Sequence, residues 1–267
     1  MQGKVVFVSV SGGKDSALTL ALALEKYKGT DTPVVALFCD TGWEHELTYC
    51  YIETLEGFFN IKIHKLVGIP LPELIRKKNV FPSPRRRFCT SECKTVPTYK
   101  FYEHIYFHFP FKTAEVWQGL RREESHARRN IKDYTHKAFE KTRFGERFPF
   151  DISYRYPIAD LTERQVFEEL RKRGIPVNPL YKEGFKRVGC YPCFLSKKDI
   201  IQVICKALEG DEFSVNRLEE MKELDCSVMG RFNIDCDLSE LIEKAKRKLE
   251  ERKRKLEIKR LMLELPL

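Results

Sequence analysis

A short loop between an apolar segment and a helix-forming segment carries residue types that could bind phosphate. Residues 11–16 read SGGKDS, which offers two glycines for a tight turn, hydroxyl donors and one lysine charge. If a helix begins here, its first backbone N–H groups and the positive end of its dipole point at the same place. The alternative is a purely structural glycine turn before a helix. We expect a phosphate-binding loop formed by Ser11, Gly12, Gly13, Lys14, Asp15 and Ser16.

The loop differs from the Walker A pattern G-x-x-x-x-G-K-[ST] at two positions. Val8 stands where that pattern has glycine, and Asp15 follows Lys14 where it has Ser or Thr. The missing hydroxyl is the group that would hold Mg²⁺ in a P-loop enzyme. The sequence therefore disfavours a kinase or a GTPase-like NTPase.

Four of the nine cysteines form two close pairs. Cys89 and Cys93 are separated by three residues, and Cys190 and Cys193 by two. Four thiolates can bind a structural zinc ion or an iron–sulfur cluster, and spacing alone does not distinguish them. A redox dithiol or buried thiols are further alternatives. The remaining cysteines are expected to pack as small apolar side chains: Cys39, Cys50, Cys205, Cys226 and Cys236.

Apolar segments of strand length alternate with helix-like segments in the first two thirds of the chain. Buried strands are predicted at residues 5–10, 34–38, 61–66 and 116–119. Helices are predicted at residues 17–27 and within 160–174, where Asp160 or Thr162 would cap the start and Gly174 would follow the end. Residues 69–84 are predicted as a loop with at most a short helix, and residues 121–150 as a long active-site loop.

This alternation predicts an α/β fold, with a parallel twisted sheet and helices on both faces. Residues after 193 look helical, with a partial apolar stripe between 238 and 260. We therefore expect a nucleotide-binding domain over residues 1–200 and a helical, basic C-terminal extension over residues 201–267.

The net charge of +9 favours polyanionic partners. Residues 243–260 hold ten Lys or Arg against four Glu, which fits either a solvated helix face or a contact with nucleic acid. No segment is apolar enough to span a membrane, and the first residues do not resemble a signal peptide. A cytoplasmic protein is expected.

Beyond the loop itself, four further blocks carry a resemblance to a known family. SGGKDS resembles the PP-loop of the ATP pyrophosphatase and adenine nucleotide alpha-hydrolase-like superfamily. The blocks FCDTGWEHELT, RFCTSECKTVP, GLRREESHARR and IPVNPLYKEGFKRVGCYPC follow in this order between residues 38 and 193. Together they resemble the phosphoadenosine phosphosulfate (PAPS) reductase family, which implies a Rossmann-like nucleotide-binding fold.

The resemblance implies roles for particular residues. Phe38 and Cys39 would hold the adenine, and the phosphate or sulfate contacts would come from Arg121, Arg122 and Arg128, with His126 as a further candidate. The nucleotide pocket would be shaped by Asp40, Thr41, Gly42 and Glu44. The catalytic residues would be Lys14, Asp15, Arg121 and Arg122.

The implied cofactors are ATP, or PAPS or adenylylsulfate in its place, together with Mg²⁺. By the same resemblance Cys89, Cys93, Cys190 and Cys193 would hold a [4Fe–4S] cluster, with Zn²⁺ as the alternative. Adenylylsulfate reductases show an adjacent Cys-Cys in the first block, whereas this chain separates Cys89 from Cys93.

Three functions follow as hypotheses. The leading one is an enzyme that cleaves ATP to AMP and pyrophosphate, and so adenylates an acceptor, expected to be tRNA or DNA, for thiolation. The second is a sulfonucleotide reductase that releases sulfite, although the last thirty residues hold no cysteine in a Glu-Cys-Gly setting. The third is a nucleotide-sensing or nucleic-acid-binding module without turnover. Expected partners include a sulfur-donor protein or thiol reductant and a second copy of the chain.

Overall fold

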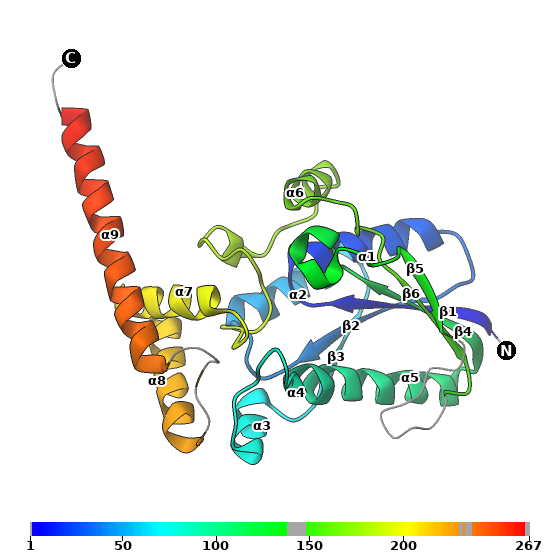
Figure 1. Cartoon of the computed structure of the whole chain (residues 1–267). Coiled ribbons are helices and arrows are strands. Elements are labelled where there is room, and N and C mark those ends of the chain that lie inside the picture. Colours follow the sequence, from blue (N-terminus) through cyan, green and yellow to red (C-terminus); the bar gives the residue numbers. More distant parts are fainter. Residues whose placement is uncertain (1, 138–147, 230–231, 233–236, 265–267) are drawn as a thin grey trace. The chain divides into compact units, whose positions relative to one another are not determined.

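Six strands form one sheet in the order β3-β2-β1-β4-β6-β5 (Figure 1). Their bounds are β1 (Gln2–Val10), β2 (Val34–Asp40), β3 (Ile63–Val67), β4 (Phe111–Gln118), β5 (Tyr134–Lys137) and β6 (Asp151–Arg155). All neighbours pair in parallel except β5, which is antiparallel to β6. The computed structural model describes all residues except 1, 138–147, 230–231, 233–236 and 265–267.

The chain divides into two compact units. The first comprises residues 1–70 and 89–189, and the second comprises residues 71–88 and 190–267. The sheet belongs entirely to the first unit. The predicted boundary at residue 200 separates a nucleotide-binding domain from a C-terminal extension. Because it is defined by nucleotide binding, it stays a prediction.

Strand β1 is buried on both faces because its apolar residues alternate between two cores. Val6, Val8 and Val10 pack in one core, while Val5 and Phe7 pack in the other. A strand covered on both sides is the arrangement that a continuous apolar run predicts for a parallel sheet. The predicted α/β class, with helices on both faces, is confirmed.

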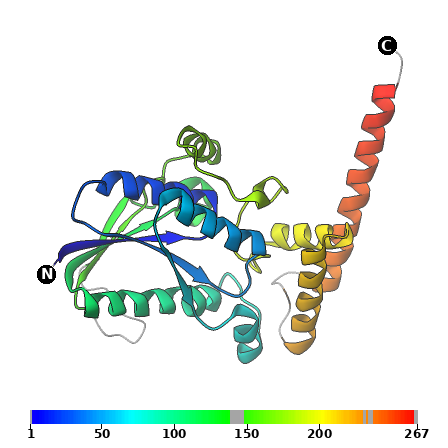
Figure 2. The same cartoon turned by 180° about the vertical axis from the view of Figure 1, so that it is seen from behind.

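Helices cover the two faces of the sheet in the first unit (Figures 1 and 2). One face carries α1 (Lys14–Tyr27), α2 (Glu46–Phe59) and α6 (Glu163–Lys172). The other carries α5 (Val96–His108), which continues from α4 (Phe88–Thr90) and the π-helical turn η1 (Ser91–Thr95). Short 3₁₀ turns complete the unit: η2 (Arg122–Glu124), η3 (His126–Arg128) and η4 (Pro179–Tyr181).

The predicted cap of α6 is confirmed in detail. The hydroxyl of Thr162 accepts the N–H of Gln165, and the Gln165 side chain accepts the N–H of Thr162, so the two form a capping box. Gly174 follows the helix with φ of +64°. This helix brings its first residue, Glu163, to the carboxyl end of the sheet.

Strand order decides where a ligand can bind. Strand β1 lies between β2 and β4, and the chain leaves β1 toward one face of the sheet and reaches β4 from the other. Such a switch point leaves a crevice at the carboxyl ends of the strands. The predicted phosphate loop, the residues after β2 and the residues after β4 all begin at this edge.

The second unit is helical. It contains α3 (Leu71–Lys78), α7 (Lys197–Leu208), α8 (Glu212–Ser227) and α9 (Leu238–Glu264). Helix α7 packs against both α8 and α9, with Val203, Ile204 and Leu241 fully buried. The predicted helical C-terminal region is confirmed. In the part of the chain that the structure describes, no helix has the length and apolarity that a membrane crossing requires.

The loop predicted at residues 121–150 is wrong in part. Residues 134–137 form the edge strand β5, and the predicted strand at 116–119 begins earlier, at Phe111. Strand β5 reads YTHK and lies at the edge of the sheet, where it pairs only with β6. Its sequence lacks the continuous apolar run that is typical of a strand buried on both faces. Strand β6 was not predicted, since its five residues show no run longer than two apolar side chains. Residues 138–147 of the predicted loop lie outside the described residues.

Candidate nucleotide site

The loop of residues 11–16 joins the end of β1 to the first turn of α1. Gly12 has φ of +75°, and a Cβ added there would lie 2.5 Å from Cγ2 of Thr48. Among the described residues, the backbone N–H groups of Gly12, Gly13, Asp15 and Ser16 have no acceptor. These donors lie at the positive end of a 14-residue helix, which makes the loop a site for an anion.

Two residues from near η4 hold this loop in place. The buried side chain of Asn178 donates to the carbonyl of Gly12 at 3.1 Å and accepts the N–H of Leu180 at 3.0 Å. The hydroxyl of Tyr181 accepts the N–H of Lys14 at 3.0 Å. Neither residue can be predicted as functional from its local sequence, because their partners lie more than 160 positions away along the chain. The segment NPLY within the fourth family block was the available signal.

Asp15 lies between two buried cations. Its Oδ2 is 3.0 Å from Nζ of Lys14, and its Oδ1 accepts Nε–H of Arg121 at 2.6 Å. Lys14 also lies 3.4 Å from Glu163, and Arg121 lies 2.5 Å from Glu123. The side chains of Lys14 and Arg121 are only 2% and 6% exposed. The network therefore fixes two positive charges beside the loop.

The network engages both carboxylate oxygens of Asp15 with cations. This arrangement is consistent with a residue that orients the groups around a bound phosphate.

Gly119 allows the residues after β4 to approach the loop. A Cβ added at Gly119 would lie 2.7 Å from the carbonyl carbon and oxygen of Asp15, which are backbone atoms that cannot move aside. The glycine thus sets the distance between the loop and the segment that carries Arg121. Gly119 opens the arginine block GLRREESHARR, but its local sequence does not reveal this close approach.

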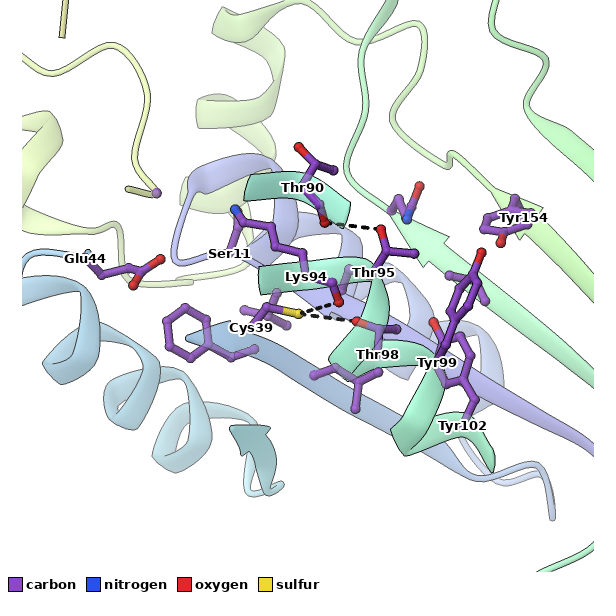
Figure 3. A pocket seen from close by; sticks show the side chains of 17 residues that line it. Ser11, Cys39, Glu44, Thr90, Lys94, Thr95, Thr98, Tyr99, Tyr102 and Tyr154 are labelled. Carbon is purple, nitrogen blue, oxygen red and sulfur yellow. Dashed lines mark hydrogen bonds between the residues drawn. The ribbon is translucent and has the colours of Figure 1, made fainter. Parts of the chain in front are cut away.

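A cavity of about 270 Å³ opens beside the loop at the carboxyl ends of β1, β2 and β4. Ser11 contributes to both the loop and the cavity wall, and Phe38 and Cys39 line the cavity as predicted for an adenine site. Figure 3 shows Lys94 and Thr98 reaching the cavity from η1 and α5, with Tyr154 on β6 across from them. The size and mixed lining suit a small organic ligand.

Cys39 is held inside this cavity wall. Its Sγ lies 3.3 Å from Oγ1 of Thr98 and 3.7 Å from the carbonyl of Lys94. Burial raises the pKa of the Cys39 thiol, so the neutral thiol dominates near pH 7. Lys94 is the one cationic side chain among the residues that line the cavity, and it is not among the site residues predicted from the sequence.

The residues after β2 brace the cavity edge. Asp40 accepts from the N–H of Gly42 at 2.8 Å and from the hydroxyl of Tyr49 at 2.7 Å, and it pairs with Lys65 at 2.7 Å. Burial alone would raise the pKa of Asp40, but these three donors outweigh it and lower the pKa below its ordinary value. Asp40 is thus an ionised support, and it does not line the cavity.

Glu44 is buried and does line the cavity. It accepts from the N–H and hydroxyl of Thr41, at 3.0 and 2.7 Å, and from the N–H of Trp43. Burial raises the pKa of Glu44 in spite of these donors. Gly42 has φ of +64° and turns against Pro70. Thr41 and Gly42 therefore shape this edge through Glu44 and the backbone.

The other predicted arginines do not join the loop. Arg122 pairs with Asp133 and Asp160, and Arg128 pairs with Glu124. Neither arginine lines the cavity, and nor does His126 in η3. Arg122 and Arg128 thus make ion pairs with nearby carboxylates, whereas Arg121 is brought to the loop.

The two cysteine pairs belong to different units. Cys89 and Cys93 lie one helical turn apart along α4 and η1, so they share a face, and Cys93 is fully buried. Cys190 and Cys193 lie in the loop before α7 and are half-buried. Within neither unit do the described residues gather three or more His, Cys, Asp or Glu side chains at metal-binding distance. Each pair supplies two thiol donors, as soft metals and iron–sulfur clusters require.

A comparison with known protein families shows to which family this chain belongs. Residues 5–196 match the family described as the phosphoadenosine phosphosulfate reductase domain. The chain belongs to this family. The match to the PAPS reductase domain family spans all six strands of the sheet and ends at Ser196, the residue before α7 begins.

Several relatives share most of this domain. A 37.8 kDa protein of Escherichia phage 186 is 28% identical over 74% of this chain and 69% of its own length. A Methanocaldococcus jannaschii protein is 34% identical over 71% of this chain, but the match spans only 36% of that protein. An adenosine 5'-phosphosulfate reductase of Allochromatium vinosum is 24% identical over 71% of this chain and 67% of its length.

Solved structures with a similar chain path share low sequence identity with this chain. A PAPS reductase from Candida auris is 18% identical, with a TM-score of 0.49 over 70% of this chain and 81% of that one. A U34-tRNA thiolase from Methanococcus maripaludis, solved with its [4Fe–4S] cluster, is also 18% identical, with a TM-score of 0.45 over 93% of this chain and 73% of that one.

Proposed function

We propose that this chain is an ATP-dependent sulfur-transfer enzyme that forms AMP and pyrophosphate. The observation that carries the proposal is that Ser11 belongs both to the cavity wall and to the loop. A nucleoside seated in the cavity would have its first phosphate at the loop and its outer phosphates at the loop N–H groups. That placement favours chemistry at the α-phosphate over chemistry at the γ-phosphate.

The reaction would proceed in two balanced steps. An acceptor oxygen attacks the α-phosphorus, the bond to the bridging oxygen breaks, and pyrophosphate leaves. A hydrosulfide sulfur then attacks the adenylated carbon or phosphorus of the acceptor, and AMP leaves with the oxygen. Catalysis in the first step is a matter of position and charge.

The chain's own groups would serve the first step. Loop N–H groups stabilise charge on the departing pyrophosphate, while Lys14 and Arg121, fixed by Asp15, supply the nearby positive field. Glu44 and Thr98 would contact the nucleoside in the cavity. Mg²⁺ would accompany the nucleotide, and no residue of the site is assigned to it.

For the sulfur step we propose Cys89, Cys93, Cys190 and Cys193 as ligands of an iron–sulfur cluster. Bound there, a cluster would supply the sulfur or the electrons for the transfer. Iron and acid-labile sulfide in anaerobically purified protein would support this ligand set, and loss of both in Cys93→Ser would assign Cys93. A colourless protein that holds only zinc would refute it.

The test of the proposed function is sulfur incorporation. Anaerobic protein is incubated with ATP, a sulfide source and either tRNA or duplex DNA, and the nucleic acid is digested and examined by mass spectrometry. The proposal predicts sulfur in the product, with AMP and pyrophosphate formed in equal amounts. Nucleotide binding without turnover on any acceptor would favour the non-catalytic module instead.

Sulfonucleotide reduction is the second candidate, and the family match and the 24% identical adenosine 5'-phosphosulfate reductase favour it. The same protein is incubated with PAPS or adenylylsulfate and a thiol reductant. Release of sulfite without pyrophosphate would establish this function in place of thiolation.

A further inference from the structure

Residues 76–87 of the second unit carry charge of one sign only. Their sequence is RKKNVFPSPRRR, which holds six Lys or Arg and no Asp or Glu. The first acids along the chain on either side are Glu73 and Glu92. All six cationic side chains are exposed. Like charges at this density repel one another, and segments rich in Lys and Arg are typical of contacts with polyanions.

The six cations gather at two neighbouring places. Three of them end helix α3, at residues 76–78, where they also face the negative end of the helix dipole. The other three are the consecutive arginines 85–87, which we call the arginine loop. Nζ of Lys78 lies 5.7 Å from the ring centre of Phe88, the residue after the arginine loop. The end of α3 and the arginine loop therefore form one basic surface.

The arginine loop is held by a tight turn with a buried base. The N–H of Arg86 donates to the carbonyl of Ser83 at 3.0 Å, and the N–H of Ser83 donates to the carbonyl of Arg86 at 3.2 Å. Pro84 follows Ser83, at the position that proline favours in such turns. Before the turn, Phe81 is buried, with its ring centre 4.8 Å from that of Phe232. The backbone of the loop is thus fixed in advance, which lowers the entropy cost of binding a partner.

The guanidinium groups of the arginine loop are unused inside the chain. Within the described residues, no carboxylate lies within ion-pair distance of them, and they donate no hydrogen bond. In the first unit, by contrast, Arg122, Arg128 and Arg173 each pair with a carboxylate. Each guanidinium presents five N–H donors in a planar fork. The donors of the arginine loop are therefore available to acceptors from outside the chain.

The chemistry of the surface favours a nucleic acid backbone as the source of those acceptors. Guanidinium groups bind phosphate through two parallel hydrogen bonds. Consecutive side chains point to different sides of the backbone, so three arginines in a row suit several phosphates along a strand better than one isolated anion. A membrane surface would also be met by exposed apolar side chains, and residues 76–87 expose no large apolar side chain.

The arginine loop also lies close to a proposed sulfur ligand along the chain. Arg87 precedes Cys89 by two residues, and two residues of fully extended chain span about 7 Å. The covalent chain therefore keeps a strand held by the arginine loop near one of the thiols that we propose for the sulfur step.

We propose that the arginine loop binds the phosphodiester backbone of the nucleic acid that accepts sulfur. The inference rests on the proposed function for the identity of the acceptor. Binding itself needs no ATP, so it is measured separately from turnover.

The test compares full-length variants that lose the same charge. One variant changes the arginine loop to glutamine (R85Q, R86Q and R87Q). The matched control changes three exposed cations of the first unit (K28Q, K112Q and R171Q). Circular dichroism and thermal melting check that both fold like the parent protein. Affinity for tRNA, for a short DNA duplex and for vesicles containing phosphatidylserine is measured at several salt concentrations.

The proposal predicts that the glutamine variant binds its nucleic acid about 30-fold more weakly at about 100 mM salt, while the control loses less than about 3-fold. The slope of log affinity against log salt should become less steep by about 2 to 3, close to 0.7–0.9 for each phosphate that is no longer neutralised. Of tRNA and duplex DNA, the one whose binding falls more is the one that the loop holds. Equal losses in the two variants would overturn the proposal, as would vesicles that bind the parent protein as tightly as both nucleic acids do.

A lysine variant separates guanidinium geometry from charge. The changes R85K, R86K and R87K keep the three charges but remove the planar forks. We expect this variant to keep the parental salt slope and to bind about 3- to 10-fold more weakly than the parent protein. A lysine variant as weak as the glutamine variant would contradict phosphate contact through charge.

Failure of this proposal and failure of the proposed function give different results. If the enzyme thiolates an acceptor and the glutamine variant keeps the parental KM for that acceptor, only the arginine-loop proposal is refuted. If the protein binds nucleic acid through the arginine loop but never cleaves ATP, only the thiolation proposal is refuted.

Discussion

The cations of the two units are used in opposite ways. Lys14 and Arg121 in the first unit are almost fully buried, and each is paired with two carboxylates. Arg85 and Arg87 in the second unit are exposed, and no carboxylate among the described residues pairs with them. Buried, paired cations hold a geometry, because leaving one unpaired is costly. Exposed, unpaired cations attract a partner and are sensitive to salt.

The strongest way to break the buried arrangement is Asp15→Ala. It leaves Lys14 and Arg121 without their shared carboxylate, so both can leave the loop, and we expect turnover to fall about 1000-fold or more. The fold should persist, since the loop lies at the edge of the sheet. Single-turnover AMP formation and thermal melting measure the two effects. Asp31→Ala, an exposed carboxylate, is the control, and full activity in Asp15→Ala would refute the assigned role.

Gly119→Ala changes the same network without touching a charge. The added Cβ would meet backbone atoms of Asp15 at 2.7 Å, which pushes Arg121 and the loop apart, and we expect kcat/KM to fall about 100-fold. Gly57→Ala has open space around the added Cβ and should leave kcat/KM unchanged. Equal activity in the two variants would show that the close approach is not needed.

Tyr181→Phe removes one hydrogen bond to the loop. The N–H of Lys14 loses its acceptor, which should cost about 1–3 kcal/mol and weaken nucleotide binding about 10-fold. Calorimetric titration with ATP measures the change. Tyr51→Phe removes a hydroxyl that binds the carbonyl of Pro176 instead, so it should affect stability but not ATP affinity. A Tyr181→Phe protein with parental affinity would contradict the support role.

Glu115 is a buried, paired carboxylate away from the loop, and it should affect stability alone. Burial would raise its pKa, but donors led by Arg155 and Lys4 outweigh this and lower the pKa to about 2. A lowered pKa stabilises the fold above the ordinary value near 4.5, and this stabilisation, up to about 3 kcal/mol, is lost as pH falls toward 2. Urea unfolding of Glu115→Gln should show a flatter pH dependence between about 5 and 2. Unchanged pH dependence would contradict this.

The sheet and the loop could be predicted because their signals are local. Val5 to Val10 form a continuous apolar run, and SGGKDS follows it directly. Strand β5 could not be predicted, since an edge strand with one neighbour carries no buried-strand pattern. The helical C-terminal region was predictable from its apolar stripe.

The supports of the site were hidden for a different reason. Asn178, Tyr181 and Gly119 act through contacts with residues far away in the sequence, and no periodicity encodes such contacts. In the arginine block, by contrast, the local sequence predicts more phosphate contacts than the structure brings to the loop. Three arginines with equal local signals were predicted as phosphate contacts, and only Arg121 meets the loop, because the chain turns into η2 directly after it.

Product analysis with ATP labelled at the α- and γ-phosphates tests the central claim most directly. In the presence of an acceptor, the account predicts that the α-label appears in AMP or in adenylated acceptor and the γ-label in pyrophosphate, with Asp15→Ala inactive. Formation of ADP and inorganic phosphate would contradict it, because the loop would then act on the γ-phosphate.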